Sequence, residues 1–115
     1  ASSHKLGRLI AIIDRNGFQL DGRVEDLTSI EPLDDKWRAF GWEVHTVDGH
    51  DIAAVTELLR RLRADDTRQK PALVISKTIK GKGVSYMETE PGWHVGYLDP
   101  MDAEAAIAEI KSKVI

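Results

Sequence analysis

The stretch LIAIIDRNG, residues 9–17, decides the fold class of this chain. It begins with a continuous apolar run rich in β-branched residues and ends in a polar turn. Such a run is typical of a strand buried on both faces. The Asn-Gly pair is also compatible with a hairpin turn, but Arg23 to Asp35 do not continue as an alternating return strand. We therefore predict a buried strand at 9–13 that leads into a long loop at 14–33.

Helix-like and strand-like segments alternate after this strand. The predicted elements are a helix at Leu33–Phe40 ended by Gly41, a strand at Trp42–Val47, a helix at Ile52–Ala64, a strand at Pro71–Ser76, a loop at Thr78–Pro100 and a helix at Met101–Val114. Strands separated by helical crossovers imply a parallel sheet. The predicted fold class is therefore α/β, a parallel sheet with helices on both faces.

Local patterns support the helices. The apolar residues of the 52–64 helix recur at helical spacing, at Ile52, Val55, Leu58, Leu59 and Leu62. Trp37 and Phe40 lie three residues apart, which predicts that they share one helix face. Asp99 is a candidate N-cap of the last helix, and Pro100 suits its first position.

The overall composition excludes several classes of function. The chain has 115 residues, a net charge of −3 and no cysteine, so disulfides, thiolate metal sites and a cysteine nucleophile are excluded. Basic residues are interleaved with acidic ones, which does not indicate nucleic-acid binding. No apolar run is long enough to cross a bilayer, and the N-terminus does not resemble a signal peptide. We expect a cytoplasmic protein.

Three short strands would leave both sheet edges open, which is a pairing hazard. The segment Ser2–Gly7 also reads like the end of a helix. We therefore expect residues 1–115 to be one part of a larger α/β domain, either as a fragment or as one chain of a split assembly.

Three polar segments are candidates for chemistry, and each also has a simpler structural interpretation. Asn16 follows the first strand and offers an oxygen ligand for Mg²⁺, although Asp-Arg-Asn-Gly is more often a plain turn. The loop KTIKGKG at 77–83 combines glycines and lysines that suit a phosphate, or it is a solvated basic loop. His94 lies between Trp93 and Gly96 and can move a proton near neutral pH, or it is structural.

Both long loops leave the carboxyl ends of predicted strands, the edge at which parallel sheets bind ligands. The remaining histidines, His4, His45 and His50, have no comparable context. Gly49-His50-Asp51 is most simply a helix start.

Taken together, these segments resemble the transketolases of the thiamine-diphosphate family. The matching stretches are LIAIIDRNGFQLDG (9–22), EPLDDKWRAFGWEVHTVDGHD (31–51) and PALVISKTIKGKGVSYMETEPGWH (71–94). They cover nearly the whole chain in order. The part they resemble is the C-terminal half of the N-terminal, PP-type thiamine-diphosphate-binding domain, and the chains of split transketolases match best.

The resemblance implies a role for five residues. Asn16 and the backbone carbonyl of Phe18 would bind Mg²⁺. Lys80 and His94 would contact the cofactor, with His94 also reaching the substrate region as the catalytic residue, and Gln19 would face the cofactor. The other half of the bipartite motif, a Gly-Asp-Gly segment, would lie upstream of this sequence, and the glutamate that activates the aminopyrimidine would lie on another domain. After His94 the sequence departs from the family, since Val95 precedes the glycine.

The implied activity is that of a transketolase of the pentose phosphate pathway, of the EC 2.2.1.1 type. It would transfer a two-carbon ketol unit between sugar phosphates with thiamine diphosphate and Mg²⁺. The implied partners are the remaining transketolase domains or a split-subunit partner chain, in a dimer or heterotetramer, and residues 1–115 alone would be inactive. Two alternatives remain: another thiamine-diphosphate enzyme, such as a deoxyxylulose-phosphate synthase or a dehydrogenase of the E1 type, and a non-catalytic interaction module.

Overall fold

The computed structural model describes residues 1–20, 22–88 and 90–113. The chain divides into two compact units. One, here called the sheet unit, consists of residues 1–16 and 30–78. The other, here called the loop–helix unit, consists of residues 17–29 and 79 onward.

A three-stranded parallel sheet forms the centre of the sheet unit. Its strands are β1 (Ile10–Arg15), β5 (Ala72–Lys77) and β4 (Glu43–Asp48), in the order β1-β5-β4. All pairs are parallel, and the last rung aligns Arg15, Lys77 and Asp48. The predicted parallel α/β fold is confirmed, and β1 extends two residues beyond the predicted apolar run. The prediction that this strand is buried on both faces is wrong, because β1 is an edge strand of the sheet and Ile12 is 56% exposed.

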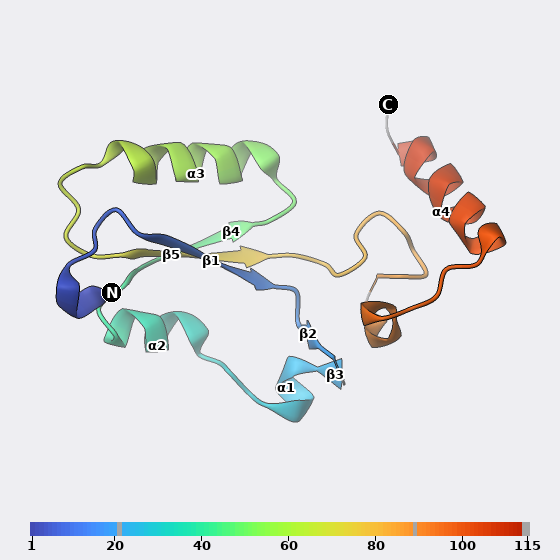
Figure 1. Ribbon diagram of the computed structural model, residues 1–115, viewed down its shortest axis with the longest axis horizontal. Helices are drawn as coiled ribbons and strands as arrows, with labels where there is room; N and C mark the ends of the chain where they lie inside the picture. Colours follow the sequence, from blue (N-terminus) through green and yellow to red (C-terminus); the bar gives the residue numbers. More distant parts are fainter. Residues whose placement is uncertain (21, 89, 114–115) are drawn as a thin grey trace. The chain divides into compact units, whose positions relative to one another are not determined.

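The two helices of the sheet unit cover opposite faces of the sheet (Figure 1). Helix α3 (Ile52–Ala64) has the predicted bounds, and α2 (Leu33–Ala39) ends shortly before Gly41. Phe40, predicted to share a helix face with Trp37, follows the helix as its C-cap and is 71% exposed. Trp37 instead packs edge-on against Trp42, with ring centroids 4.9 Å apart.

The core lies between β5 and α3. Its buried residues are Leu62, Ala72 and Val74, with Ile10, Val47, Leu58 and Leu59 packed against them. The predicted apolar stripe of α3 is therefore confirmed, except that Ile52 in the first turn is 73% exposed. Asp51 caps this helix, since its carboxylate accepts a hydrogen bond from the Ala54 amide at 2.9 Å.

The segment 17–29 of the loop–helix unit contains short elements of secondary structure that the predicted loop did not include. It contains an antiparallel pair, β2 (Phe18–Gln19) with β3 (Gly22–Arg23), and a one-turn helix α1 (Val24–Leu27). The hairpin therefore turns between Gln19 and Gly22 and not at Asn16-Gly17. Elements this short carry no readable periodicity, which is why the sequence did not reveal them.

The C-terminal part of this unit holds a 3₁₀ turn, η2 (Pro91–His94), and helix α4 (Pro100–Lys113). Asp99 accepts a hydrogen bond from the Asp102 amide at 2.8 Å, so the predicted N-cap and helix start are confirmed. The predicted end of this helix at Val114 lies outside the described residues. Ala106 of this helix is buried, whereas Ile107 and Ile110 are about half exposed.

The N-terminal segment of the sheet unit forms a single 3₁₀ turn, η1 (Ser2–His4). Among the described residues, none of the helices combines the length and the apolar character that a membrane crossing requires.

Candidate functional site

Three chain segments leave the carboxyl edge of the sheet together. Asn16 follows β1, Thr78 follows β5, and Gly49 follows β4. The Thr78 amide donates to the Arg15 carbonyl at 3.4 Å, and the Gly49 amide donates to the Lys77 carbonyl at 2.7 Å. The loops after the first and third strands therefore start side by side, as the sequence predicted.

Asp14 organises this edge. One carboxylate oxygen accepts a short hydrogen bond from the Thr78 hydroxyl, 64 residues away in the sequence. The other accepts a hydrogen bond from the side-chain nitrogen of Asn16 at 3.3 Å. Because the nitrogen of the Asn16 amide is held in this way, its oxygen is the atom that has the chemistry of a cation ligand.

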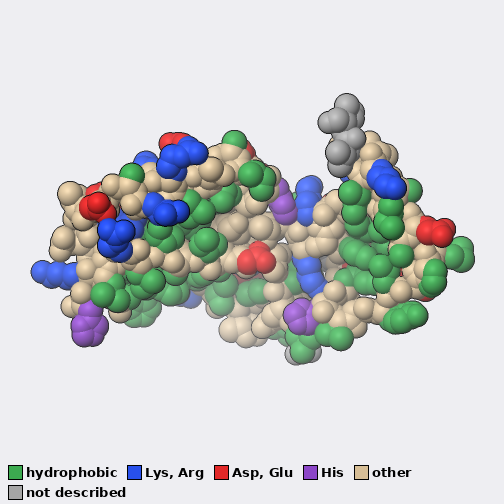
Figure 2. Space-filling view, turned by 45° about the horizontal axis from the view of Figure 1, so that its top comes forward, with side chains coloured by type: hydrophobic (Ala, Val, Ile, Leu, Met, Phe, Trp, Pro, Cys, Tyr) green, Lys and Arg blue, Asp and Glu red, His purple; other side chains and the backbone are tan. Residues whose placement is uncertain are grey.

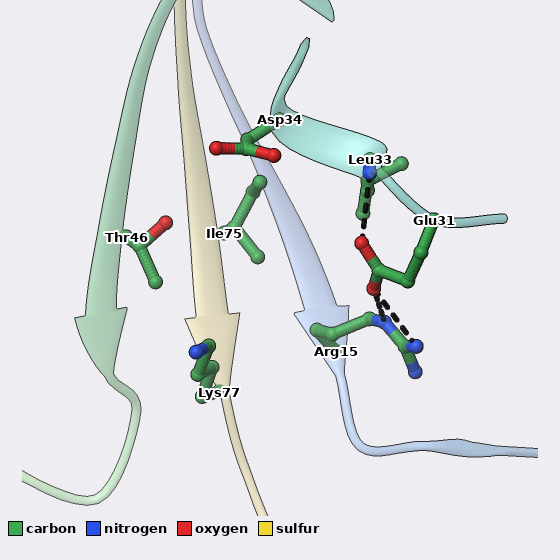
Figure 3. A pocket seen from close by; sticks show the side chains of 7 residues that line it. All are labelled: Arg15, Glu31, Leu33, Asp34, Thr46, Ile75 and Lys77. Carbon is green, nitrogen blue, oxygen red and sulfur yellow. Dashed lines mark hydrogen bonds and ion pairs between the residues drawn. The ribbon is translucent and has the colours of Figure 1, made fainter. Parts of the chain in front are cut away.

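A pocket of about 260 Å³ lies on the α2 side of the sheet near this edge (Figure 3). It is lined by Arg15, Glu31, Leu33, Asp34, Thr46, Ile75 and Lys77. Arg15 donates to Glu31 through Nε at 3.2 Å and Nη2 at 3.0 Å, and the other carboxylate oxygen of Glu31 accepts from the Leu33 amide at 2.8 Å. These contacts tie the end of β1 to the start of α2.

The Leu33 amide, followed by the Arg15 guanidinium, lowers the pKa of Glu31 below its ordinary value. A lowered carboxylate pKa stabilises the fold above the unfolded-state pKa, and this contribution is lost as the pH falls through the folded-state pKa. We therefore expect Glu31→Gln to lower the free energy of unfolding at pH 7 by at most about 1 kcal/mol, because the Glu31 side chain is about half exposed and water screens the pair.

Urea unfolding at a series of pH values measures the difference in the free energy of unfolding between the parent chain and Glu31→Gln. This difference should become smaller as the pH falls below 4.5, the ordinary pKa of a glutamate side chain. Glu104→Gln on the exposed surface of α4 is the matched control, and a difference between Glu31→Gln and the parent chain that does not change with pH would contradict the interpretation.

The two other residues of the predicted cation and cofactor site lie in β2. Phe18 pairs with Arg23 and Gln19 with Gly22 in the short antiparallel ladder. The Arg23 guanidinium lies 5.4 Å from the centre of the Phe18 ring, a distance at which a cation and an aromatic face attract each other. This contact stabilises the hairpin that presents the Phe18 backbone.

The KGKG loop, residues 80–83, has a structural explanation for its glycines. Gly81 has a φ of +73°, and a side chain there would collide with the backbone of Met87. Lys80 donates to the Pro91 carbonyl at 3.3 Å, which joins this loop to η2. The loop therefore positions Lys80 beside the turn that carries His94.

His94 is exposed at the end of η2, and the aromatic residue before it holds the turn in place. The Trp93 indole donates to the Tyr86 carbonyl at 3.0 Å, and the two rings lie 5.4 Å apart. A side chain at Gly96 would collide with the Trp93 ring, so the glycine that follows Val95 is required by close packing. Val95 itself is 82% exposed.

The five predicted site residues belong to different units. Asn16 is part of the sheet unit, whereas Phe18, Gln19, Lys80 and His94 are part of the loop–helix unit. Their convergence on one cofactor stays a prediction. Sequence reasoning missed Asp14 and Thr78, for which the only signal was their position at the ends of two neighbouring strands.

The other histidines have structural contacts. The His45 ring nitrogen Nε2 lies 2.7 Å from Glu43 on β4, and the His50 amide donates to Asp48 at 2.9 Å in the turn before α3. In the part of the chain that the structure describes, no group of three or more His, Asp or Glu side chains is arranged to hold a metal ion.

The sequence of this chain is similar to those of one protein family. Residues 1–114 match the family model described as transketolase, thiamine diphosphate binding domain. The chain is 41% identical over 113 residues to one subunit of the apulose-4-phosphate transketolase of Phocaeicola vulgatus, and 37% identical to one subunit of a 6-deoxy-6-sulfo-D-fructose transketolase of a Clostridium species. In both cases the match covers 98% of this chain, which spans 40% of the relative's length.

The fold is also similar to that of solved transketolases. The crystal structure of transketolase from Campylobacter jejuni superposes with a TM-score of 0.85 at 29% identity, covering 96% of this chain and 17% of that one. A transketolase from Pichia stipitis gives a TM-score of 0.84 at 26% identity, covering 96% of this chain and 16% of that one.

Proposed function

The chain belongs to the family of transketolase thiamine-diphosphate-binding domains, and on that premise we propose that it anchors the cofactor diphosphate and Mg²⁺ of a transketolase. The reaction is the transfer of a two-carbon ketol unit between sugar phosphates. The observation that carries the proposal is the placement of Asn16, directly after β1 at the carboxyl edge of the sheet, where parallel α/β sheets bind ligands.

The donor atoms available here fit Mg²⁺, which prefers oxygen ligands and keeps phosphate oxygens and water in its coordination shell. Asn16 would supply its side-chain oxygen, and Phe18 its backbone carbonyl. Asp14 would act as a positioning residue, because it holds the Asn16 nitrogen and is itself held by Thr78. The remaining ligands would be diphosphate oxygens and an aspartate from another part of the assembly.

Lys80 and His94 would face polar groups of the cofactor and substrate. The hydrogen bond from Lys80 to the Pro91 carbonyl supports this pairing, because it joins the lysine to the turn that carries His94. The exposed imidazole offers two ring nitrogens for hydrogen bonds to such groups. Gln19 would add a hydrogen-bonding side chain beside the cofactor. Thiamine diphosphate, when bound, supplies the carbanion-stabilising chemistry, and these residues supply position and charge.

The assembly would need a partner. Relatives that this chain matches over 98% of its length are named as single subunits of a transketolase, and the chain spans 40% of their length. We therefore expect a partner polypeptide, in a dimer or heterotetramer, to complete the active site. We also expect the assembly to be cytoplasmic.

Residues 1–115 alone should show no turnover, whereas the assembly with its partner should convert a ketose donor. A donor panel tests this, with fructose 6-phosphate, apulose 4-phosphate and 6-deoxy-6-sulfofructose as substrates and product formation as the readout. Turnover by residues 1–115 without another chain would contradict the proposal. Preference for a 2-oxo acid donor would favour the E1 or deoxyxylulose-phosphate synthase alternative. If isothermal titration of Mg²⁺–thiamine diphosphate into the protein releases or absorbs no heat, a non-catalytic module would be favoured.

A further inference from the structure

A second pocket, of about 190 Å³, opens in the sheet unit at the amino ends of the strands. It is lined by Arg8, Leu62, Arg63, Asp65 and Arg68. These residues come from the segment before β1, the last turn of α3 and the segment before β5. Because each strand has six residues, with a rise of about 3.3 Å each, this pocket lies about 20 Å from the edge that carries Asn16.

Arg68 is the deepest cation of this arginine pocket. Its Nε donates to the Gly7 carbonyl at 2.6 Å, which orients the guanidinium. Its Nη1 is buried and has no hydrogen-bond partner among the described residues. A guanidinium stays charged at all accessible pH values, and a buried donor without a partner is costly. Because this nitrogen is shielded from solvent, an anion in the pocket would be attracted by the delocalised positive charge of the Arg68 guanidinium and would not accept a hydrogen bond from Nη1.

The other charges do not neutralise the pocket. Arg63 has no hydrogen-bond or ion-pair partner within the described residues, and Arg8 is paired with Asp66 at 2.8 Å. The one lining carboxylate, Asp65, accepts hydrogen bonds from the hydroxyl and the amide of Thr67, which together lower its pKa. Asp65 keeps its negative charge, which also acts on Arg68, and Asp66 offsets Arg8, so the excess positive charge of the pocket comes from Arg63.

Helix α3 explains only part of this arrangement. Cations near a helix C-terminus interact favourably with the helix dipole, which accounts for Arg61 and Arg63 in the last turn. It does not account for Arg68, which follows the helix, or for Arg8, which comes from another segment. Basic side chains gather over the α3 side of the sheet unit, with acidic ones between them (Figure 2).

We infer that the arginine pocket binds a phosphate-type oxyanion, with Arg63 and Arg68 as its ligands and Arg8 at the rim. Guanidinium groups bind phosphate through paired, charge-assisted hydrogen bonds. A single water needs about 10–15 Å³ of cavity volume, so the pocket has room for a tetrahedral anion. The same chemistry fits inorganic phosphate and the phosphate group of a sugar phosphate.

Equilibrium dialysis of the assembled protein with radiolabelled inorganic phosphate tests the inference, at constant ionic strength and with Mg²⁺–thiamine diphosphate saturating the cofactor site. We expect a saturable phosphate site whose affinity falls roughly tenfold in Arg63→Gln, the loss expected for one charge-assisted hydrogen bond. Arg8→Gln, at an exposed position, should weaken binding less. Arg61→Gln, in the same helical turn but outside the pocket lining, is the matched control and should bind as the parent does.

Competition then identifies the source of the phosphate group. Displacement of the label by glucose 6-phosphate at lower concentration than by unlabelled phosphate would assign the site to a phosphomonoester, and the reverse order to inorganic phosphate. Phosphate binding that is equal in Arg63→Gln, Arg8→Gln and Arg61→Gln, or no saturable binding at all, would each overturn the inference. The same comparison is repeated without Mg²⁺–thiamine diphosphate, and a difference between Arg63→Gln and Arg61→Gln that persists there needs neither turnover nor bound cofactor, so it stands apart from a failure of the proposed function.

Discussion

Replacing Asn16 with alanine should lower the affinity of the assembled enzyme for Mg²⁺–thiamine diphosphate by at least about 100-fold, because changes even to groups that only support metal ligands cost about 10–100-fold. The substitution removes the side-chain oxygen proposed as a metal ligand. It also leaves Asp14 without one of its two donors at the sheet edge. Isothermal titration calorimetry of the cofactor in the presence of Mg²⁺ measures the change.

Two variants make the Asn16 result specific. Asn16→Asp keeps an oxygen ligand and should retain more affinity than Asn16→Ala. Gln69→Ala removes a side-chain amide before β5, at the opposite edge of the sheet, and should leave cofactor affinity unchanged, since its amide donates to the nearby Thr67 carbonyl. Cofactor binding by Asn16→Ala with the affinity of the parent enzyme would remove Asn16 from the proposed metal site.

The second large effect concerns stability. Leu73→Ala should lower the free energy of unfolding by about 2–5 kcal/mol, the range for large-to-small changes in a packed core. Leu73 lies in the central strand and is fully buried, with Ala11 and Val44 as its neighbours on the flanking strands. Because a strand between two others cannot shift easily, the cavity should collapse little. Since whole domains are stable by only about 5–15 kcal/mol, this one change should be readily measurable.

Urea unfolding followed by circular dichroism measures the loss. Leu20→Ala makes the same chemical change at a position that is 58% exposed, and its effect should stay below about 1 kcal/mol, in the range of surface substitutions. Equal losses for the two leucines would show that β5 is not the centre of the core.

Much of the fold could be predicted because its signals are local. The apolar runs of β1 and β5, the helical spacing in α3 and the cap at Asp99 each depend on residues within a few positions of one another. Where a prediction failed, a contact distant in sequence or a very short element was responsible. Phe40 is exposed at the C-cap of α2, and Trp37 packs against Trp42. The antiparallel pair β2–β3 is too short to have a pattern.

The candidate site was only partly readable from the sequence. Asn16, Lys80 and His94 stood out because residue type and neighbouring glycines suggested ligand chemistry. The residues that position them did not, because a hydrogen bond such as that between Asp14 and Thr78 joins segments 64 positions apart. The arginine pocket was likewise hidden, since Arg8, Arg63 and Arg68 come from three separate segments.

The sequence by itself determined the α/β class, the positions of the longer strands and helices and the family resemblance, because periodicity, capping and motif spacing are properties of neighbouring residues. Only the tertiary structure decided the order β1-β5-β4, the burial of β5 on both faces and the meeting of Asp14 with Thr78. Strand order and such contacts depend on which distant segments exclude water from one another, and no local pattern along the chain encodes that pairing.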